Sequence, residues 1–163
     1  SLGQGASLAA GVAFADKIDG KKSYTYLILG DGELDEGQVW EAALFAAHRK
    51  LTNLITIVDA NGKQLDGTTD SVCSLGSIED KFRSFGYHAI SVKNGNDTAQ
   101  IYEAVCQAKE EREKPSVLVL HTVKGAGIDY YAGMENCHST TVKKEDIPEF
   151  YKELDEKLAH KEV

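Results

Sequence analysis

The sequence predicts an α/β fold in which a parallel sheet is flanked by helices on both faces. Four apolar segments rich in Ile, Leu, Val and Tyr have the length of buried strands, and these are residues 24–30, 54–59, 87–92 and 116–122. Helical patterns separate successive strands. Alternation of this kind is typical of right-handed βαβ units, whose crossover helices cover the sheet.

The helix expected over residues 38–50 has an unusually wide apolar stripe. Apolar side chains follow the i, i+3, i+4, i+7, i+8 spacing from Val39 to Ala47, and Trp40 and Leu44 widen the stripe. We therefore expect Trp40 and Leu44 to be covered by another subunit or domain, or else inside the same chain. The other expected helices are residues 6–16, 77–85, 97–113 and 144–160.

Composition limits the class of protein. With 163 residues, 42% hydrophobic and 27% charged, residues 1–163 suit one globular domain. The net charge of −8 argues against nucleic acid or an anionic membrane as a partner, and no apolar run approaches the roughly 20 residues of a membrane span. The chain has no initiating Met and opens inside a Gly-rich phrase, which suggests a fragment of a larger subunit.

The cysteines indicate a reducing compartment. Cys73, Cys106 and Cys137 form neither an even set for disulfides nor a Cys-x-x-Cys pair. We expect three free thiols that serve in packing. The cytoplasm is the expected location.

Acidic residues occupy a position where phosphate is usually bound. Gly30, Asp31 and Gly32 follow the first strand and precede a helix, which is the outline of a phosphate-binding turn. Glu33, Asp35 and Glu36 follow, and no Lys or Arg is near them in the sequence. The stretch taken alone could be an ordinary tight turn, with acids that complement a helix dipole.

The spacing of Asp31 and Asn61 favours a metal site. They follow the first and second strands and lie 30 positions apart, about what one crossover requires. If the strands are neighbours, about 5 Å apart, both side chains face the same volume. A carboxylate, an amide oxygen and a main-chain carbonyl from "NGKQ" suit Mg²⁺ or Ca²⁺. Such a metal would carry the phosphate. The long Gly-rich segments 60–76 and 123–142 are further candidates for ligand binding.

Three phrases together resemble the transketolase family. The central phrase is "GDGELDEGQVWEAALFAAHRKLTNLITIVDANGKQLDG", which is similar to the family's thiamine-diphosphate motif. The flanking phrases are "SLGQGASLAAGVAFA" and "HTVKGAGIDYYAGMENCHS". The resemblance covers residues 1 to about 138. It implies the diphosphate domain of the thiamine-diphosphate-binding fold, with thiamine diphosphate and Mg²⁺ (or Ca²⁺) as cofactors.

The resemblance also implies roles for individual residues. The divalent ion would be held by the side chains of Asp31 and Asn61 and the backbone oxygen of Lys63. Other residues implied to contact the cofactor are Gly30, Gly32 and the amide of Glu33 at the diphosphate, and Leu2 and Leu65 at the thiazolium ring. His138 matches a histidine at the diphosphate end of the substrate channel. Glu36, with Glu41, matches acids at the subunit contact that link two cofactor sites.

The chain departs from the family pattern in two ways. The family's Ser-Lys-Gly-His segment does not occur, and Cys137 stands where a Trp is usual. The resemblance further implies that the catalytic acid comes from a pyrimidine-binding domain or subunit, in a dimer or heterotetramer.

The implied function is the diphosphate-binding component of an enzyme that transfers a two-carbon ketol unit between sugar phosphates, incomplete alone. Two alternatives stay open. One is a non-catalytic truncated module that binds Mg²⁺ and diphosphate weakly. The other is another thiamine-diphosphate enzyme, such as deoxyxylulose-phosphate synthase or a 2-oxo-acid decarboxylating subunit.

Overall fold

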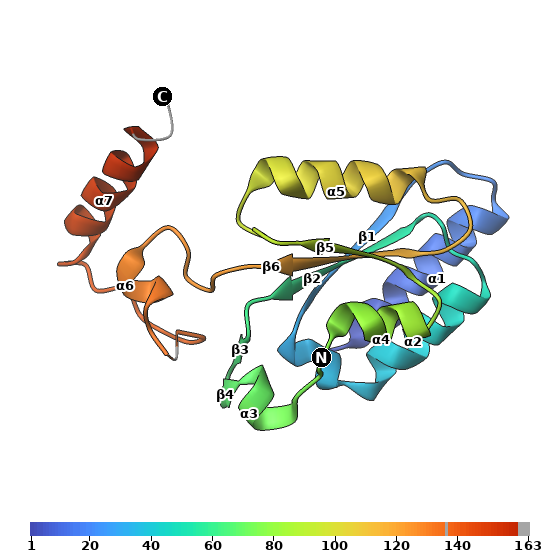
Figure 1. Ribbon diagram of the computed structural model, residues 1–163, viewed down its shortest axis with the longest axis horizontal. Helices are drawn as coiled ribbons and strands as arrows, with labels where there is room; N and C mark the ends of the chain where they lie inside the picture. The colour runs from blue at the N-terminus through green and yellow to red at the C-terminus, as the bar shows by residue number, and fades with distance from the viewer. Residues whose placement is uncertain (136, 160–163) are drawn as a thin grey trace.

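The four predicted strands form one parallel sheet. The computed structural model describes residues 1–135 and 137–159. The strands are β1 (Thr25–Gly30), β2 (Leu54–Ala60), β5 (His88–Val92) and β6 (Ser116–His121). All pairs are parallel, in the order β1-β2-β6-β5 (Figure 1). The predicted sheet is confirmed, and each strand end lies within one residue of its expected position.

Helices cover both faces of the sheet, as predicted. In Figure 1, α1 (Gln4–Ile18), α2 (Gly37–His48) and α4 (Ile78–Ser84) lie below the sheet, and α5 (Thr98–Glu110) lies above it. The two layers have separate cores. Small residues of α1 and α2 and Phe82 of α4 pack on one face, while Ala104 and Ala108 of α5 pack on the other. Alternate strand residues point to opposite faces, which divides the apolar side chains between the cores.

Trp40 is partly buried by its own chain. Its ring centroid lies 5.1 Å from that of Phe82 and 5.4 Å from that of Phe85, and its Nε1 donates to the Leu34 carbonyl at 2.8 Å. Packing inside the chain thus covers part of Trp40, and a partner for the rest stays a prediction. Leu44 is 60% exposed. Its coverage by another subunit stays a prediction.

The segment 60–76 is more ordered than the sequence suggested. It contains an antiparallel hairpin of β3 (Lys63–Gln64) and β4 (Gly67–Thr68), followed by α3 (Thr69–Cys73). A short helix, α6 (Asp129–Ala132), likewise lies in segment 123–142. The three cysteines are free, as expected, but Cys73 is exposed, so its expected packing role is wrong.

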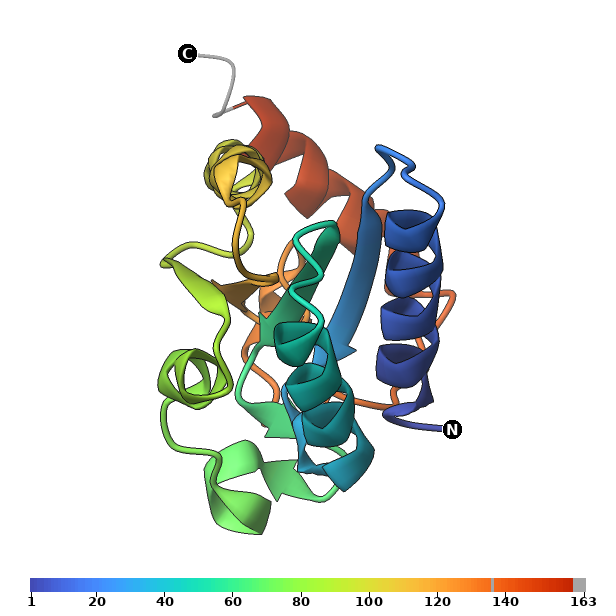
Figure 2. The ribbon, with the colours of Figure 1, turned by 90° about the vertical axis from the view of Figure 1, so that its right-hand side faces the viewer.

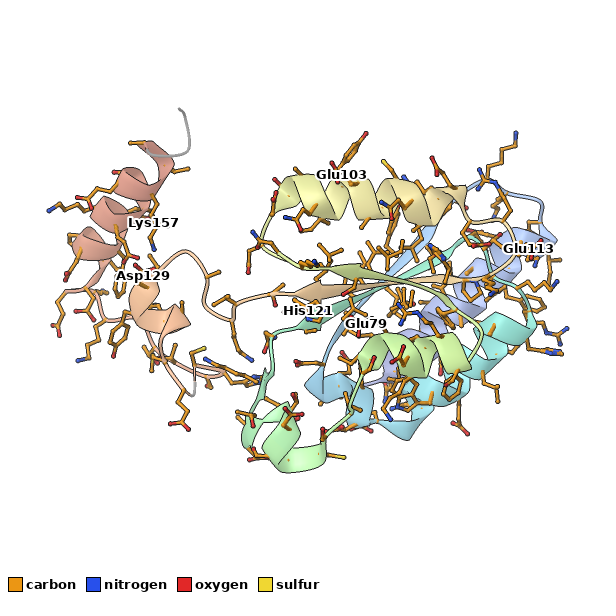
Figure 3. The ribbon with its side chains drawn as sticks, in the orientation of Figure 1. Glu79, Glu103, Glu113, His121, Asp129 and Lys157 are labelled. Atoms are coloured by element: carbon orange, nitrogen blue, oxygen red, sulfur yellow. The ribbon has the colours of Figure 1, made fainter. Side chains whose placement is uncertain are left out.

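The last helix stands beyond the sheet. It is α7 (Ile147–Ala159), which begins three residues later than predicted, and His160 lies outside the described residues. Lys157 of α7 binds Asp129 of α6, with 2.6 Å between Nζ and Oδ1 (Figure 3). No helix within residues 1–135 and 137–159 is long and apolar enough to cross a membrane.

A polar cluster fastens α4 to the sheet. Glu79 Oε1 accepts a hydrogen bond from Ser91 Oγ at 2.8 Å and lies 3.1 Å from His121 Nε2 (Figure 3). Burial raises the pKa of Glu79, but hydrogen bonds from its own backbone N–H, Ser91 and His121 outweigh burial and hold that pKa below its ordinary value of 4.5. The cluster therefore stabilises the fold through an ionised carboxylate.

Glu79→Gln should destabilise the protein at neutral pH. Each hydrogen bond is worth about 1 kcal/mol, and those to charged groups more, so we expect a loss of about 1–3 kcal/mol in the free energy of unfolding. Because the folded-state pKa is lowered, this contribution is present above pH 4.5 and is lost as the pH falls through the folded pKa. Urea unfolding at pH 7 and pH 3.5 measures it. An equal difference between wild type and variant at both pH values would contradict the assignment.

Candidate functional site

The ends of β1 and β2 bring Asp31 against the turn that carries Asn61. The strands are neighbours, with Gly30 opposite Asp59. Asp31 Oδ2 accepts a hydrogen bond from the Gly62 N–H at 2.5 Å, and Oδ1 accepts one from the Gly32 N–H at 2.9 Å. Asp31 thus meets the residue that follows Asn61, 31 positions further along the chain, at the carboxyl edge of the sheet. This is the edge where parallel sheets bind ligands.

Asp31 is a buried acid without an ion-pair partner among the described residues. Its exposed fraction is 3%. Burial raises the pKa of its carboxyl, and Asp59 adds to this, while the Gly62 and Gly32 N–H groups and Lys124 lower it in part. A buried carboxylate is costly unless a positive group compensates it. The site is therefore suited to a cation.

The turn after β2 carries two of the oxygen atoms expected at the metal, on Asn61 and Lys63. Asn61 Oδ1 accepts from the Lys63 N–H at 3.0 Å, an Asx-type turn. The Lys63 ammonium donates to the Met134 carbonyl at 2.6 Å. The Lys63 carbonyl instead accepts from Lys124 Nζ at 3.4 Å. The Lys63 ammonium is thus occupied by the Met134 carbonyl, and a role for the Lys63 carbonyl at a cation stays a prediction.

Lys124 is a site residue that the sequence analysis did not select. It follows β6, which is the neighbour of β2 in the sheet. Its Nζ lies 2.8 Å from His138 Nδ1 and its charge lowers the pKa of Asp31. Lys124 is thus the basic group that was missing beside the acidic turn. The phrase "HTVKGAG" contained it, but the strand order that brings it here was unknown.

The Glu33 carboxylate ties the N-terminal phrase to the turn. Its Oε1 accepts from the Gly3 N–H at 2.8 Å, and its Oε2 from the Gly30 N–H at 3.3 Å. Gln38 Nε2 donates to the Leu2 carbonyl at 2.8 Å. Figure 2 shows the N-terminus at the same end of the molecule as the β1 arrowhead. We expected a role only for the amide of Glu33 and missed its carboxylate.

Gly3 is required where the N-terminal phrase meets α2. Its φ is 78°, and a Cβ there would lie 2.9 Å from Glu36 Cβ and from Gln38 Cγ. Both the conformation and the close contact exclude larger residues.

The remaining candidates lie around this centre. Leu2 and Leu65 are 60% and 57% exposed, which leaves two apolar side chains open to a ligand. Glu36 and Glu41 are exposed on α2 or its N-cap. No group of three or more His, Cys, Asp or Glu residues suited to a metal occurs in the described part of the chain. A set built from one carboxylate, one amide and one carbonyl does not need such a group.

A family model described as "Transketolase, thiamine diphosphate binding domain" matches residues 1–159. The chain belongs to this family. The transketolase-family chain is 45% identical over 145 residues to the 6-deoxy-6-sulfo-D-fructose transketolase subunit SqwG of Clostridium sp., covering 89% of this chain and 52% of that protein. It is 35% identical over 158 residues to an apulose-4-phosphate transketolase subunit of Phocaeicola vulgatus, covering 97% and 56%.

Solved structures agree on the fold. Transketolase from Leishmania mexicana has a TM-score of 0.73 at 28% identity, covering 99% of this chain and 29% of that one. A transketolase mutant from Pichia stipitis has a TM-score of 0.73 at 26% identity, covering 99% and 28%. The predicted thiamine-diphosphate-binding fold is confirmed. The chain spans about half the length of the two curated relatives above.

Proposed function

We propose that this chain is the diphosphate- and metal-binding component of a transketolase-like enzyme. The observation that carries the proposal is the buried Asp31 carboxylate, held against the Asn61 turn in a chain of the transketolase family. Residues 1–163 would act as one domain that holds one end of thiamine diphosphate.

The oxygen set at the sheet edge fits a divalent ion. Asp31 and Asn61 would bind Mg²⁺ or Ca²⁺ through their side chains, and Lys63 through its carbonyl. Hard oxygen donors of this kind suit both ions. The burial of Asp31 supports this assignment, because an ion would neutralise a carboxylate whose ionisation is otherwise penalised.

The diphosphate would lie over the turn between β1 and α2. Gly30, Gly32 and the backbone of Glu33 would approach it, because glycine leaves the main chain accessible. Lys124 would add a positive charge. Leu2 and Leu65 would contact the thiazolium ring, and their exposure leaves them available. His138, beside Lys124, would face the substrate channel.

When bound, thiamine diphosphate supplies the nucleophile and the electron sink for moving a two-carbon ketol unit between sugar phosphates. The chain's own residues would bind and orient it. Asp31, Asn61 and Lys63 would fix its charged end, and the Glu33 carboxylate would hold the N-terminal phrase, and with it Leu2, beside the ring. The names of the relatives favour a transketolase over deoxyxylulose-phosphate synthase or a 2-oxo-acid decarboxylating subunit.

A partner subunit would supply the pyrimidine-binding half of the site. Both curated relatives above are named as subunits, which supports a dimer or heterotetramer here. Exposed apolar side chains on α1 and α2 offer a surface for it: Leu8 at 71%, Val12 at 54% and Leu44 at 60% exposure. Glu36 and Glu41 would lie at this contact. The free thiols support a cytoplasmic location.

Calorimetric titration with thiamine diphosphate tests the proposal. We expect saturable binding that depends on Mg²⁺ and is lost with excess chelator. Thiamine monophosphate, which lacks the second phosphate, serves as the control ligand and should bind much more weakly. No binding, or equal binding without a divalent ion, would overturn the proposed site. Binding without turnover in the presence of a partner subunit would favour the non-catalytic module.

A further inference from the structure

The carboxamide of Gln64 lies against the acidic turn. Gln64 ends β3, and the hairpin folds its side chain over Gly32. A Cβ placed on Gly32 would lie 2.8 Å from Gln64 Cβ and 3.1 Å from Gln64 Oε1. Gly32 is the residue whose N–H donates to Asp31 Oδ1. The Gln64 carboxamide therefore sits beside the residue that directly follows Asp31.

The Gln64 oxygen is buried without a hydrogen-bond partner in the described part of the chain. Four backbone donors of the acidic turn and of the turn before β3 are already used by other acceptors. Gly32 and Gly62 donate to Asp31, Gly30 donates to Glu33, and Lys63 donates to Asn61. A buried acceptor left in this way is destabilising, and such groups are uncommon in native proteins. With these donors occupied, the Gln64 oxygen is left to a group that binds at the site.

We infer that Gln64 Oε1 accepts a hydrogen bond from a water molecule on the divalent ion. The inference rests on the proposed function, in which Asp31, Asn61 and the Lys63 carbonyl hold that ion. These protein ligands leave coordination positions of a six-coordinate ion to water and phosphate oxygens. A fully ionised diphosphate has no donor for Gln64, whereas a metal-bound water has two. Gln64 is thus a positioning residue that acts through water, not a ligand.

This role would give β3 two neighbouring residues that act on the bound ion. Lys63 would present its carbonyl to the ion, and the next residue would present its side chain to the ion's water. One two-residue strand would then contribute both to the metal and to its hydration. Contacts of this outer kind typically change metal affinity by about 10- to 100-fold when removed.

Gln64→Met, Gln64→Glu and the control Gln107→Met test the inference. Methionine has a similar length but accepts no comparable hydrogen bond, so Mg²⁺ affinity in the presence of saturating thiamine diphosphate should fall about 10-fold. Glutamate keeps an acceptor and should restore the affinity to near wild type or above. Gln107 is exposed on α5, so its change should leave the affinity unaltered.

Two further readouts separate this role from a structural one. Without metal, Gln64→Met should melt at the same temperature as wild type or higher, because it removes an unsatisfied buried oxygen. With Mn²⁺ and thiamine diphosphate bound, water-proton relaxation should show faster exchange of metal-bound water in Gln64→Met than in wild type.

Unchanged Mg²⁺ affinity in Gln64→Met would overturn the inference while leaving the proposed function intact. A weakening by Gln64→Glu as large as that by Gln64→Met would also overturn it, because the carboxamide would then be donating to diphosphate. Absence of Mg²⁺-dependent cofactor binding in wild type would overturn the proposed function, and the inference with it.

Discussion

Replacing Asp31 with asparagine is expected to abolish Mg²⁺-dependent binding of thiamine diphosphate. The change keeps the size of the side chain and removes its charge. Removing one partner from a buried charge pair costs about 3–5 kcal/mol, which corresponds to a loss of affinity on the order of 10²- to 10⁴-fold. Asp31 is 3% exposed, so solvent would screen little of this loss. Calorimetry with and without Mg²⁺ measures the effect.

Asn61→Ala should lose the same binding by a different route. It removes a proposed amide ligand and also the hydrogen bond from the Lys63 N–H that shapes the turn. Both variants should keep the fold, because the surrounding sheet core does not depend on either side chain. Asp35→Asn is the matched control. Asp35 is exposed in the short helix η1 (Gly32–Asp35) of the same acidic stretch, so its change should leave binding unaltered.

Retained Mg²⁺-dependent affinity in Asp31→Asn would remove this carboxylate from the metal site. If circular dichroism shows that Asp31→Asn does not fold, Asn61→Ala serves as the test instead. A folded Asn61→Ala variant that still binds the cofactor with Mg²⁺ would contradict the account on its own.

The chain alone should show no transketolase activity, even when saturated with thiamine diphosphate and Mg²⁺. In this family the acid that acts on the aminopyrimidine is expected from a partner domain, and a general acid typically contributes 10²- to 10⁴-fold to the rate. The loss should be larger here, because the pyrimidine pocket would be missing as well. The cofactor would be held at its diphosphate while its reactive end stayed in water.

Coupled assays of two-carbon transfer test this second expectation. The isolated chain is compared with the same chain mixed with the pyrimidine-domain subunit of its own system. Turnover should appear only in the mixture, and Asp31→Asn in the mixture should remove it again. Appreciable turnover by the purified chain alone would show that the chain does not depend on a partner for the pyrimidine-binding half of the site.

Much of the fold could be predicted from the sequence because each main strand is a continuous apolar run. The parallel arrangement followed from the helices between them, and the adjacency of β1 and β2 made the 30-residue interval from Asp31 to Asn61 meaningful. Sequence patterns did not predict the shortest elements. The two-residue strands β3 and β4 have no periodicity to detect, although their hairpin places Gln64 over Gly32.

Contacts that depend on the strand order could not be predicted. Lys124 reaches the acidic turn only because β6 lies between β2 and β5, which sequence order does not show. Glu33 and Gly3 are likewise 30 positions apart and meet because α1 packs beside β1 (Figure 2). The width of the α2 stripe suggested a partner for Trp40, and Phe82 and Phe85 cover part of it within the chain.

Anomalous diffraction from crystals grown with Mn²⁺ and thiamine diphosphate tests the central claim most directly. The account predicts one strong Mn²⁺ peak within about 2–2.5 Å of an Asp31 carboxylate oxygen, Asn61 Oδ1 and the Lys63 carbonyl oxygen, with diphosphate oxygens completing the ligands. A bound cofactor with its Mn²⁺ peak elsewhere, or with no peak between these three oxygens, would contradict it.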